Sequence, residues 1–170
     1  ISNGFTAQES AKSLKAFTGV GRRFDYKGLR ENKTVYDDYA HNVQKIAACI
    51  KTAQGLSNNP VIAVFQPHGY GPLGFMKDAL LEELRKVLRS DDKFILLPVF
   101  YAGGSTSFKP SSAEVAEEYS KGGLPTITFE ERDELKPYLD SISEAASVIV
   151  LGARDPGLAD WVASLTESAT

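Results

Sequence analysis

Hydrophobic residues alternate along the chain between short continuous runs and longer stretches in which they recur every three or four positions. Continuous apolar runs are typical of strands that are buried on both faces of a sheet. The short segment 23–26 is expected to pair with 33–38 as a hairpin that turns around Gly28 and Asn32. The strands predicted on these grounds span residues 23–26, 33–38, 61–65, 94–100, 126–129 and 147–151.

The stretches between the strands show helical periodicity. Val43, Ile46 and Ile50, for example, lie on one face of a helix and are expected to face the sheet. Ser111 and Glu114 form a capping-box pattern that marks a helix start. Strands alternating with helices predict a single α/β domain with crossover helices. The predicted helices span about residues 7–16, 41–54, 73–88, 111–120, 130–145 and 158–165.

Length and charge narrow the function classes. The chain has 170 residues and a formal charge of -3, with basic residues scattered among acidic ones, so nucleic acid is not an expected partner. No apolar run approaches the roughly 20 residues of a membrane span, so no membrane is expected either. One cysteine, Cys49, and the lack of a leader pattern favour a cytoplasmic location. The first residues resemble the interior of a protein, which suggests a domain excised from a longer chain.

Ligands of open α/β sheets bind beyond the carboxyl ends of the strands, so the residues after each strand are the first candidates for a site. The first such segment holds Asp37, Asp38, Tyr39, His41 and Asn42 at a predicted strand-to-helix turn. Two carboxylates, a phenol, an imidazole and an amide make a polar cluster beside the free N–H groups of a helix start. The alternative is that an aspartate or the asparagine only caps the helix.

A second segment, 66–72, follows the strand at 61–65. Its glycines let the backbone approach a ligand, and His68 and Tyr70 can exchange hydrogen bonds there, although such a sequence is often only a turn. Residues 101–105 and 152–157 follow two more strands, and Arg154 is the candidate in the latter.

Several familiar kinds of site are not encoded in the sequence. The chain has no phosphate-loop motif and no glycine-rich dinucleotide fingerprint after a strand. One cysteine and two histidines exclude a closed zinc site built on Cys and His. A carboxylate-rich metal site stays open, but adjacent aspartates on a strand point in different directions.

Five blocks of sequence, in order, resemble the C-terminal domain of Mur ligases, and most closely the members that attach L-alanine or the murein tripeptide. The blocks cover most of the chain, which makes the resemblance far more specific than one short motif. They are Phe17-Thr18-Gly19-Val20-Gly21-Arg22-Arg23-Phe24, Val35-Tyr36-Asp37-Asp38-Tyr39-Ala40-His41-Asn42, Ala63-Val64-Phe65-Gln66-Pro67-His68, Tyr101-Ala102-Gly103 and Leu151-Gly152-Ala153.

The resemblance implies one domain of a three-domain, ATP-dependent amide ligase that acts in peptidoglycan precursor synthesis or recycling. In the family the N-terminal domain holds UDP-N-acetylmuramate, the central domain carries the phosphate loop, and the C-terminal domain closes over ATP and brings an amino acid or peptide amine. ATP and Mg²⁺ are then expected to be bound mainly by the central domain, and this chain alone is expected to be inactive. The implied fold is a Rossmann-like three-layer sandwich, with a mostly parallel sheet of about six strands, one antiparallel edge strand and flanking helices.

The resemblance also assigns roles to residues. Asp37 and His41 are the implied catalytic residues, and Asp37, Asp38 and Tyr39 are placed near the nucleotide. The implied substrate-binding residues are Arg22, Arg23, His41, Asn42, His68, Tyr70 and Arg154. A surface ion pair with Asp25 or another acid is the alternative for the two adjacent arginines.

Departures from the family pattern leave the amine substrate open. Gly69 and Pro72 stand where alanine-adding members carry arginines that grip the amino-acid carboxylate, and Asn42 replaces a histidine. Arg154 stands at a usual glycine and is a hypothetical replacement for a lost arginine. Two other functions remain as alternatives: a freestanding nucleotide- or sugar-binding module, and an amide ligase of the folyl-polyglutamate or cyanophycin class.

Overall fold

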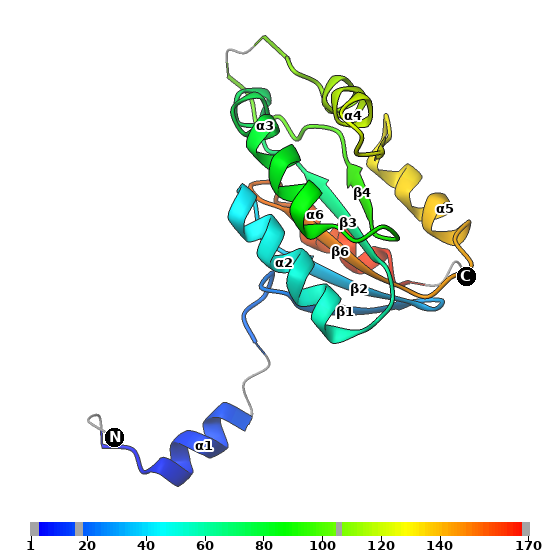
Figure 1. Ribbon diagram of the computed structural model, residues 1–170. Helices are drawn as coiled ribbons and strands as arrows, with labels where there is room; N and C mark the ends of the chain where they lie inside the picture. Colours follow the sequence, from blue (N-terminus) through cyan, green and yellow to red (C-terminus); the bar gives the residue numbers. More distant parts are fainter. Residues whose placement is uncertain (1–3, 16–18, 105–106, 168–170) are drawn as a thin grey trace.

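A six-stranded sheet forms the middle layer of the protein (Figure 1). The computed structural model describes residues 4–15, 19–104 and 107–167, so Phe17, Thr18 and Ser105 of the segments above lie outside it. The strand order is β1-β2-β6-β3-β4-β5, and only the edge strand β1 is antiparallel to its neighbour. The strands are β1 (Asp25–Arg30), β2 (Lys33–Asp38), β3 (Val61–Gln66), β4 (Lys93–Leu96), β5 (Thr126–Thr128) and β6 (Ala146–Gly152).

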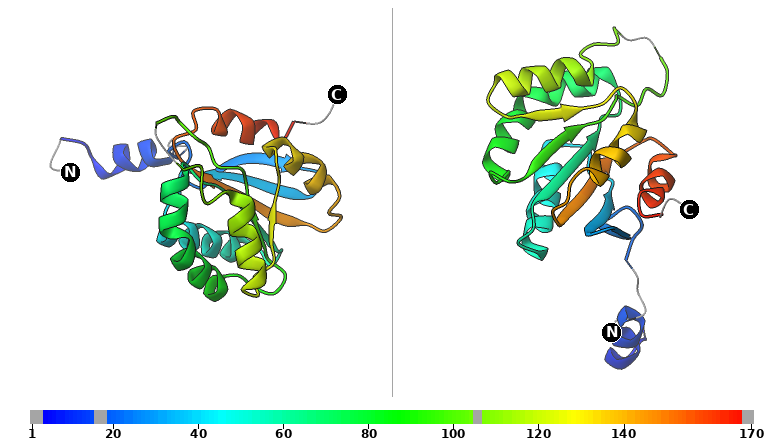
Figure 2. Two further views of the ribbon diagram at one scale, coloured as in Figure 1. Left: turned by 90° about the horizontal axis from the view of Figure 1, so that it is seen from above. Right: turned by 90° about the vertical axis from the view of Figure 1, so that its right-hand side faces the viewer.

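Helices cover both faces of this sheet, as the two views of Figure 2 show. Helices α2, α3 and α4 lie on one face, and α5 and α6 lie on the other, which confirms the predicted α/β sandwich. Helix α1 has no buried residue and lies apart from the sheet (Figure 1). The helices are α1 (Ala7–Lys15), α2 (Val43–Leu56), α3 (Tyr70–Val87), α4 (Ser112–Lys121), the short 3₁₀ helix η1 (Arg132–Glu134), α5 (Leu135–Asp140) and α6 (Leu158–Ser164).

The two faces of the sheet have separate hydrophobic cores because successive side chains of a strand point to opposite sides. In β3, Ala63 and Phe65 face α2, α3 and α4, whereas Ile62 and Val64 face α5 and α6. All six residues of β3 and all seven of β6 are buried. These continuous apolar runs are therefore the central strands, as expected. No helix in the described part of the chain is long and apolar enough to cross a membrane.

The predicted hairpin is present, and of the two residues expected at its turn only Asn32 lies there. β1 pairs with β2 as far as Arg30 and Lys33, so the turn consists of Glu31 and Asn32. Gly28 lies within β1, at a shift of register between Tyr26 and Gly28, with φ 138°. A glycine at such a backbone angle marks a β-bulge, not the turn that the sequence suggested.

Two predicted elements are too long. β4 ends at Leu96 instead of residue 100, because Pro98 has no N–H to donate to a neighbouring strand. Helix 130–145 is only the 3₁₀ turn η1 followed by α5, which ends at Asp140. Since β6 begins at Ala146, a helix continuing to residue 145 would leave no residues to redirect the chain into the sheet.

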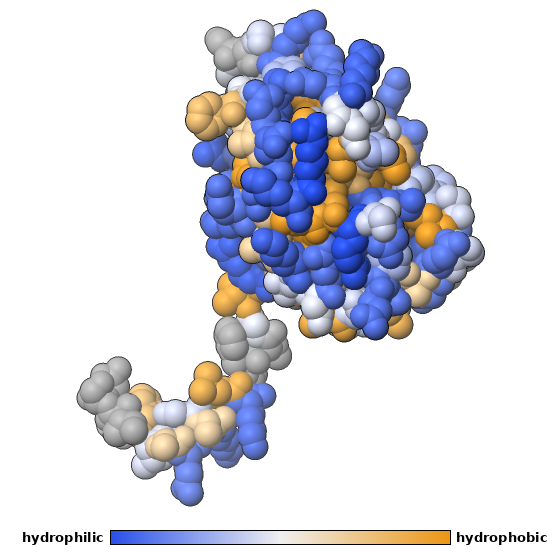
Figure 3. Space-filling view, in the orientation of Figure 1, coloured by the Kyte–Doolittle hydropathy of each residue, from blue (hydrophilic) through white to orange (hydrophobic). Residues whose placement is uncertain are grey.

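A groove of about 460 Å³ lies at the amino ends of β4 and β5, between the last turns of α3 and α4. Its apolar lining includes Leu88, Phe94, Leu124 and Ile127. Figure 3 shows an apolar area near the middle of this otherwise mostly hydrophilic face. The groove is at the opposite edge of the sheet from the carboxyl ends of the strands, so it is separate from the candidate site described below.

Asp92 connects three parts of the fold at this amino-terminal edge. Its fully buried carboxylate accepts hydrogen bonds from the backbone N–H of Val61 at 2.7 Å, the Gln54 amide at 2.7 Å and the Arg89 guanidinium at 2.9 Å. Burial opposes ionisation of Asp92, but these hydrogen bonds together outweigh burial and lower its pKa. The carboxylate therefore stabilises the junction of α2, β3 and the loop before β4.

We expect Asp92→Asn to lower the free energy of unfolding by about 2–4 kcal/mol at neutral pH, since an amide meets the same donors with its own NH₂ group. Because the folded-state pKa is depressed, this stabilisation is complete above the unfolded pKa of about 3.9 and is lost as the pH falls through the folded value. Urea unfolding of both proteins between pH 3 and 7 tests this. A difference that does not shrink at the acid end would contradict the role of the charge.

Candidate functional site

The strand ends that carry the candidate residues lie at a switch point of the sheet. β6 is placed between β2 and β3, and all three are parallel. The chain leaves β2 and β3 toward α2 and α3 on one face, but it leaves β6 toward α6 on the other. Diverging connections open a crevice at the carboxyl ends of the strands, where open α/β sheets bind their ligands.

Arg22 joins the ends of β2 and β6. Its Nε donates to Asp37 Oδ2 at 3.1 Å, and its Nη2 donates to the carbonyl oxygen of Gly152 at 2.7 Å. Its own carbonyl accepts the N–H of Tyr39 at 2.9 Å, and its backbone has a left-handed φ of 57°. Arg22 is thus held at both ends: its guanidinium pairs with Asp37, and its backbone N–H donates to Asp25 Oδ2 at 3.3 Å.

Asp37 is fully buried at the end of β2. Burial raises the pKa of its carboxyl group, and the positive charge of Arg22 opposes this rise. The carboxylate therefore depends on its arginine for its charged form.

Asp38 has both carboxylate oxygens engaged by the backbone. They accept the N–H of Phe24 at 2.6 Å and the N–H of Ala40 at 2.8 Å, and the residue is only 7% exposed. Cys49 lies against it, and burial, assisted by the Asp38 charge, raises the thiol pKa to about 12. A thiol with such a pKa is not a nucleophile at neutral pH. Positioning of the loop fits Asp37 and Asp38 better than direct contact with a nucleotide does, and their nucleotide role stays a prediction.

A row of rings extends from β2 toward β3. The Tyr39 and His41 rings are 5.5 Å apart and perpendicular, and His41 meets His68 at 5.4 Å in the same edge-on manner. The guanidinium of Arg22 lies 5.0 Å, and that of Arg23 5.7 Å, from the centre of the Tyr39 ring. The structure thus brings together predicted residues that are 46 positions apart in the chain, from 22 to 68.

Asn42, the next residue after His41, does not join this row of rings. Its side chain accepts the N–H of Lys45 at 3.0 Å and caps α2, which confirms the capping alternative for this residue. Its predicted substrate contact would have to compete with that hydrogen bond.

His68 lies where the row of rings meets a cleft of about 280 Å³. Its Nδ1 atom is buried and has no hydrogen-bond partner in the part of the chain that the structure describes. Burial lowers the pKa of His68, and the nearby charges of His41 and Arg154 lower it further. The imidazole is therefore neutral at neutral pH, and it can both donate and accept a hydrogen bond.

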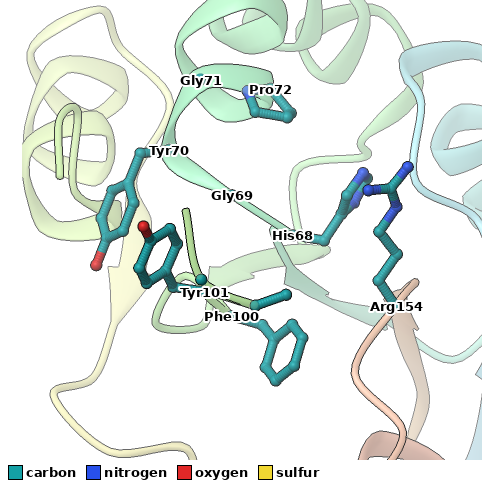
Figure 4. A pocket seen from close by; sticks show the side chains of 10 residues that line it. His68, Gly69, Tyr70, Gly71, Pro72, Phe100, Tyr101 and Arg154 are labelled. Atoms are coloured by element: carbon teal, nitrogen blue, oxygen red, sulfur yellow. The ribbon is translucent and has the colours of Figure 1, made fainter. Parts of the chain in front are cut away.

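The cleft has two different ends, which Figure 4 shows. Arg154 and His68 lie at one end, and Tyr70 and Tyr101 lie at the other. Between them Gly69 and the start of α3 form one wall, and Phe100 lines the cleft on the other side.

The sequence does not identify two aromatic residues at this end of the cleft as site residues. Tyr101, which lines the cleft, appears only in a segment after a strand and in a family block, and Phe108 packs beside it without lining the cleft. Their rings are 5.1 Å apart, and both pack against Tyr70. The position of Tyr101 after β4 was a usable signal, whereas nothing local marks Phe108.

Known proteins share both the sequence pattern and the fold of this domain. A family profile described as "Mur ligase, glutamate ligase domain" matches residues 22–154. The chain belongs to the Mur ligase family. Members of this family are ATP-dependent amide ligases, and the matched part is their C-terminal domain.

Curated Mur ligases resemble this domain along most of its length. UDP-N-acetylmuramate–L-alanine ligase from Fusobacterium nucleatum is 31% identical over 162 residues, which cover 89% of this chain and 33% of that protein. The chain thus spans about a third of the length of the curated relatives that it matches.

Solved structures share the fold of this Mur ligase domain. UDP-N-acetylmuramate-alanine ligase from Thermotoga maritima superposes with a TM-score of 0.68 at 22% identity, covering 97% of this chain and 33% of that one. A murein peptide ligase from Psychrobacter arcticus gives 0.64 at 17% identity, covering 98% and 34%. A folylpolyglutamate synthase/dihydrofolate synthase from Yersinia pestis, solved with AMPPNP and a Mn ion, gives 0.63 at 17% identity, covering 95% and 34%.

The residues at the crevice fit an anionic group better than a metal ion. Asp37 is paired with Arg22, and Asp38 accepts two backbone N–H groups, so neither offers a free carboxylate. No group of three or more His, Cys, Asp or Glu side chains could hold a metal among the residues described. Arg23, beside Tyr39, has no acidic partner among the described residues and suits an anion. No step involving Mg²⁺ is therefore derived from this domain.

We expect Arg22→Gln to destabilise the domain by about 3–5 kcal/mol at neutral pH, because it leaves Asp37 buried and charged without a partner. Removing the positive charge raises the Asp37 pKa further, so the penalty should decrease as the pH falls and the carboxyl becomes neutral. The double variant Arg22→Gln/Asp37→Asn should recover part of the loss. Chemical unfolding at pH 5 and pH 7.5 measures all three free energies.

Arg23→Gln is the matched control for this pair. Among the described residues its guanidinium has no ion pair and lies 5.7 Å from the centre of the Tyr39 ring, so its removal should cost less than about 1 kcal/mol. Equal losses for the two adjacent arginines would contradict the special role of Arg22.

We expect His41→Gln to raise the pKa of His68, because it removes a nearby titratable imidazole whose charge disfavours protonation. The value should nevertheless stay below 6.5, since burial, the larger cause, remains. Titration of the imidazole C–H signals by NMR tests this. An unchanged His68 curve would show that the two rings do not interact electrostatically.

Proposed function

We propose that this chain is the C-terminal domain of a three-domain, ATP-dependent ligase that joins UDP-N-acetylmuramate to L-alanine or a murein peptide. The reaction belongs to peptidoglycan precursor synthesis or recycling in the cytoplasm. N-terminal and central domains, which this chain does not contain, would supply the UDP-sugar site and most of the ATP and Mg²⁺ contacts. The full-length relatives and the fraction of their length that this chain spans support the proposal.

The observation that carries the proposal is the meeting of Tyr39, His41 and His68 at the switch point of the sheet. These rings lie beside cationic side chains and beside an open cleft. Such an edge can bind an anionic activated substrate and an amine next to each other. Domain closure would then bring the amine to the activated carboxylate, which is catalysis by proximity and orientation.

The role proposed for His41 is to position the amine or the phosphate. Its Nδ1 lies 2.9 Å from the Tyr39 carbonyl oxygen, so this ring nitrogen can be held by the backbone and the other directed toward the crevice. Asp37, the other proposed catalytic residue, would act through Arg22 by holding the loop in place.

An assay of the full-length protein tests the proposed function. UDP-N-acetylmuramate, ATP and one amine at a time (L-alanine, glycine, L-serine or the murein tripeptide) are combined, and phosphate release is measured. We expect release that depends on both the sugar nucleotide and one of the amines.

His41→Gln should lower kcat/KM on the order of 10²-fold through lost positioning, without a change in thermal unfolding. Lys51→Gln, an exposed change of charge on α2, is the control and should have no effect. Wild-type turnover of the His41 variant would count against its role. Absence of release with every amine, from folded protein that still binds ATP, would favour a binding module.

A further inference from the structure

Arg154 differs from most arginines of this domain because no carboxylate neutralises it. In the described residues only Arg23 and Arg154 lack an ion pair with an acid. The paired ones are Arg22, Arg30, Arg85, Arg89 and Arg132. Both unpaired arginines lie at the carboxyl edge of the sheet, and only Arg154 lines the cleft.

The backbone presents Arg154 to the cleft at some conformational cost. It has a left-handed φ of 67°, a region that residues with a side chain rarely adopt. It follows directly on the tight end of β6, where a Cβ on Gly152 would lie 2.8 Å from Leu158 and 3.1 Å from the Gln66 carbonyl oxygen. Strained positions of this kind persist where the surroundings enforce them, and they are common at binding sites.

His68 supplies a second polar group at the same end of the cleft. Figure 4 shows its imidazole beside the Arg154 guanidinium. The His68 imidazole, which has a ring nitrogen without a partner, and the unpaired Arg154 guanidinium line the same cleft, and an oxyanion suits both because each can donate a hydrogen bond.

The rest of the cleft leaves space for an apolar group. Gly69 has φ 114°, and a Cβ there would lie 3.3 Å from Pro72, so this wall favours glycine. Tyr70 and Tyr101, with centroids 5.9 Å apart, form the opposite end, and Phe108 packs on both. A volume of about 280 Å³ suits an amino acid, being just below the roughly 300 Å³ at which pockets for larger ligands begin.

We propose that Arg154 and His68 hold the carboxylate of the acceptor amino acid, and that the glycine wall and the two tyrosines receive an apolar side chain larger than the methyl group of alanine. This inference rests on the proposed ligase reaction and changes its acceptor, from L-alanine or a murein peptide to a larger apolar amino acid. A bidentate guanidinium–carboxylate contact would orient the acceptor, and the tyrosine rings would cover its side chain. Arg154 is then a specificity-determining residue.

The first test measures the binding of small molecules to the 170-residue chain, with the NMR signals of the His68 ring as the readout. The probes are L-phenylalanine, L-alanine and phenethylamine, which has the same ring and amine but no carboxylate. We expect L-phenylalanine to bind at least about tenfold more tightly than L-alanine. Arg154→Gln should weaken L-phenylalanine about tenfold or more and leave phenethylamine unchanged, whereas Lys51→Gln should change neither.

Three results would overturn the inference: no response of His68 to any amino acid, equal affinity for L-phenylalanine with and without Arg154, or equal binding of L-alanine and L-phenylalanine. The ligation assay, with L-phenylalanine added to the amines, separates this from failure of the proposed function. If Arg154→Gln still releases phosphate with an unchanged KM for the acceptor, the inference is overturned and the proposed function stands. Arg154-dependent binding without any ligation would contradict the proposed function while supporting the carboxylate site.

Discussion

The contacts of Arg22 are the constraint on which the candidate site depends. One guanidinium neutralises a fully buried carboxylate at the end of β2 and also donates to a backbone carbonyl at the end of β6. A buried carboxylate without a partner is costly, so this arrangement tolerates little displacement. The N–H of Tyr39 donates a hydrogen bond to the carbonyl oxygen of Arg22. The loop that carries Tyr39 and His41 is therefore held in place together with Arg22. The ion pair thus acts on the site indirectly, by fixing the backbone from which the functional side chains extend.

Sheet topology explains why the unpaired positive charge collects at this edge. The loops after β2, β6 and β3 diverge to opposite faces, so they cannot pack fully against one another. Acidic residues near them are already occupied: Asp37 by Arg22, and Asp155 by Gln66 and Arg132. Arg23 and Arg154 therefore lack internal partners in the described structure. Their charges are available to an anionic ligand, and the same edge is where substrate would arrive in a closed ligase.

Sequence patterns predicted the layers and the central strands because burial on both faces produces continuous apolar runs, as in β3 and β6. They failed at element ends, where single groups decide. Pro98 ends β4 early, and the bulge at Gly28 allows β1 to continue to Arg30. The location of the site could also be predicted, since it follows from the direction of parallel strands. The partners within it could not, because Arg22 contacts Gly152 across 130 positions and no local pattern records such a contact.

The same limit explains why the resemblance to Mur ligases alone leaves the acceptor open. A family motif identifies residues that share positions, but the charge of a site depends on which side chains are neutralised inside the domain. Compared with the pattern of alanine-adding members, Gly69 and Pro72 leave one side of the cleft without two positive charges, whereas Arg154 adds one positive charge from another strand end. A guanidinium that enters from β6 instead of α3 approaches a bound carboxylate from a different direction. If Arg154 holds the acceptor carboxylate as proposed, the acceptor lies differently in the cleft even for the same reaction, with its side chain directed toward Tyr70 and Tyr101.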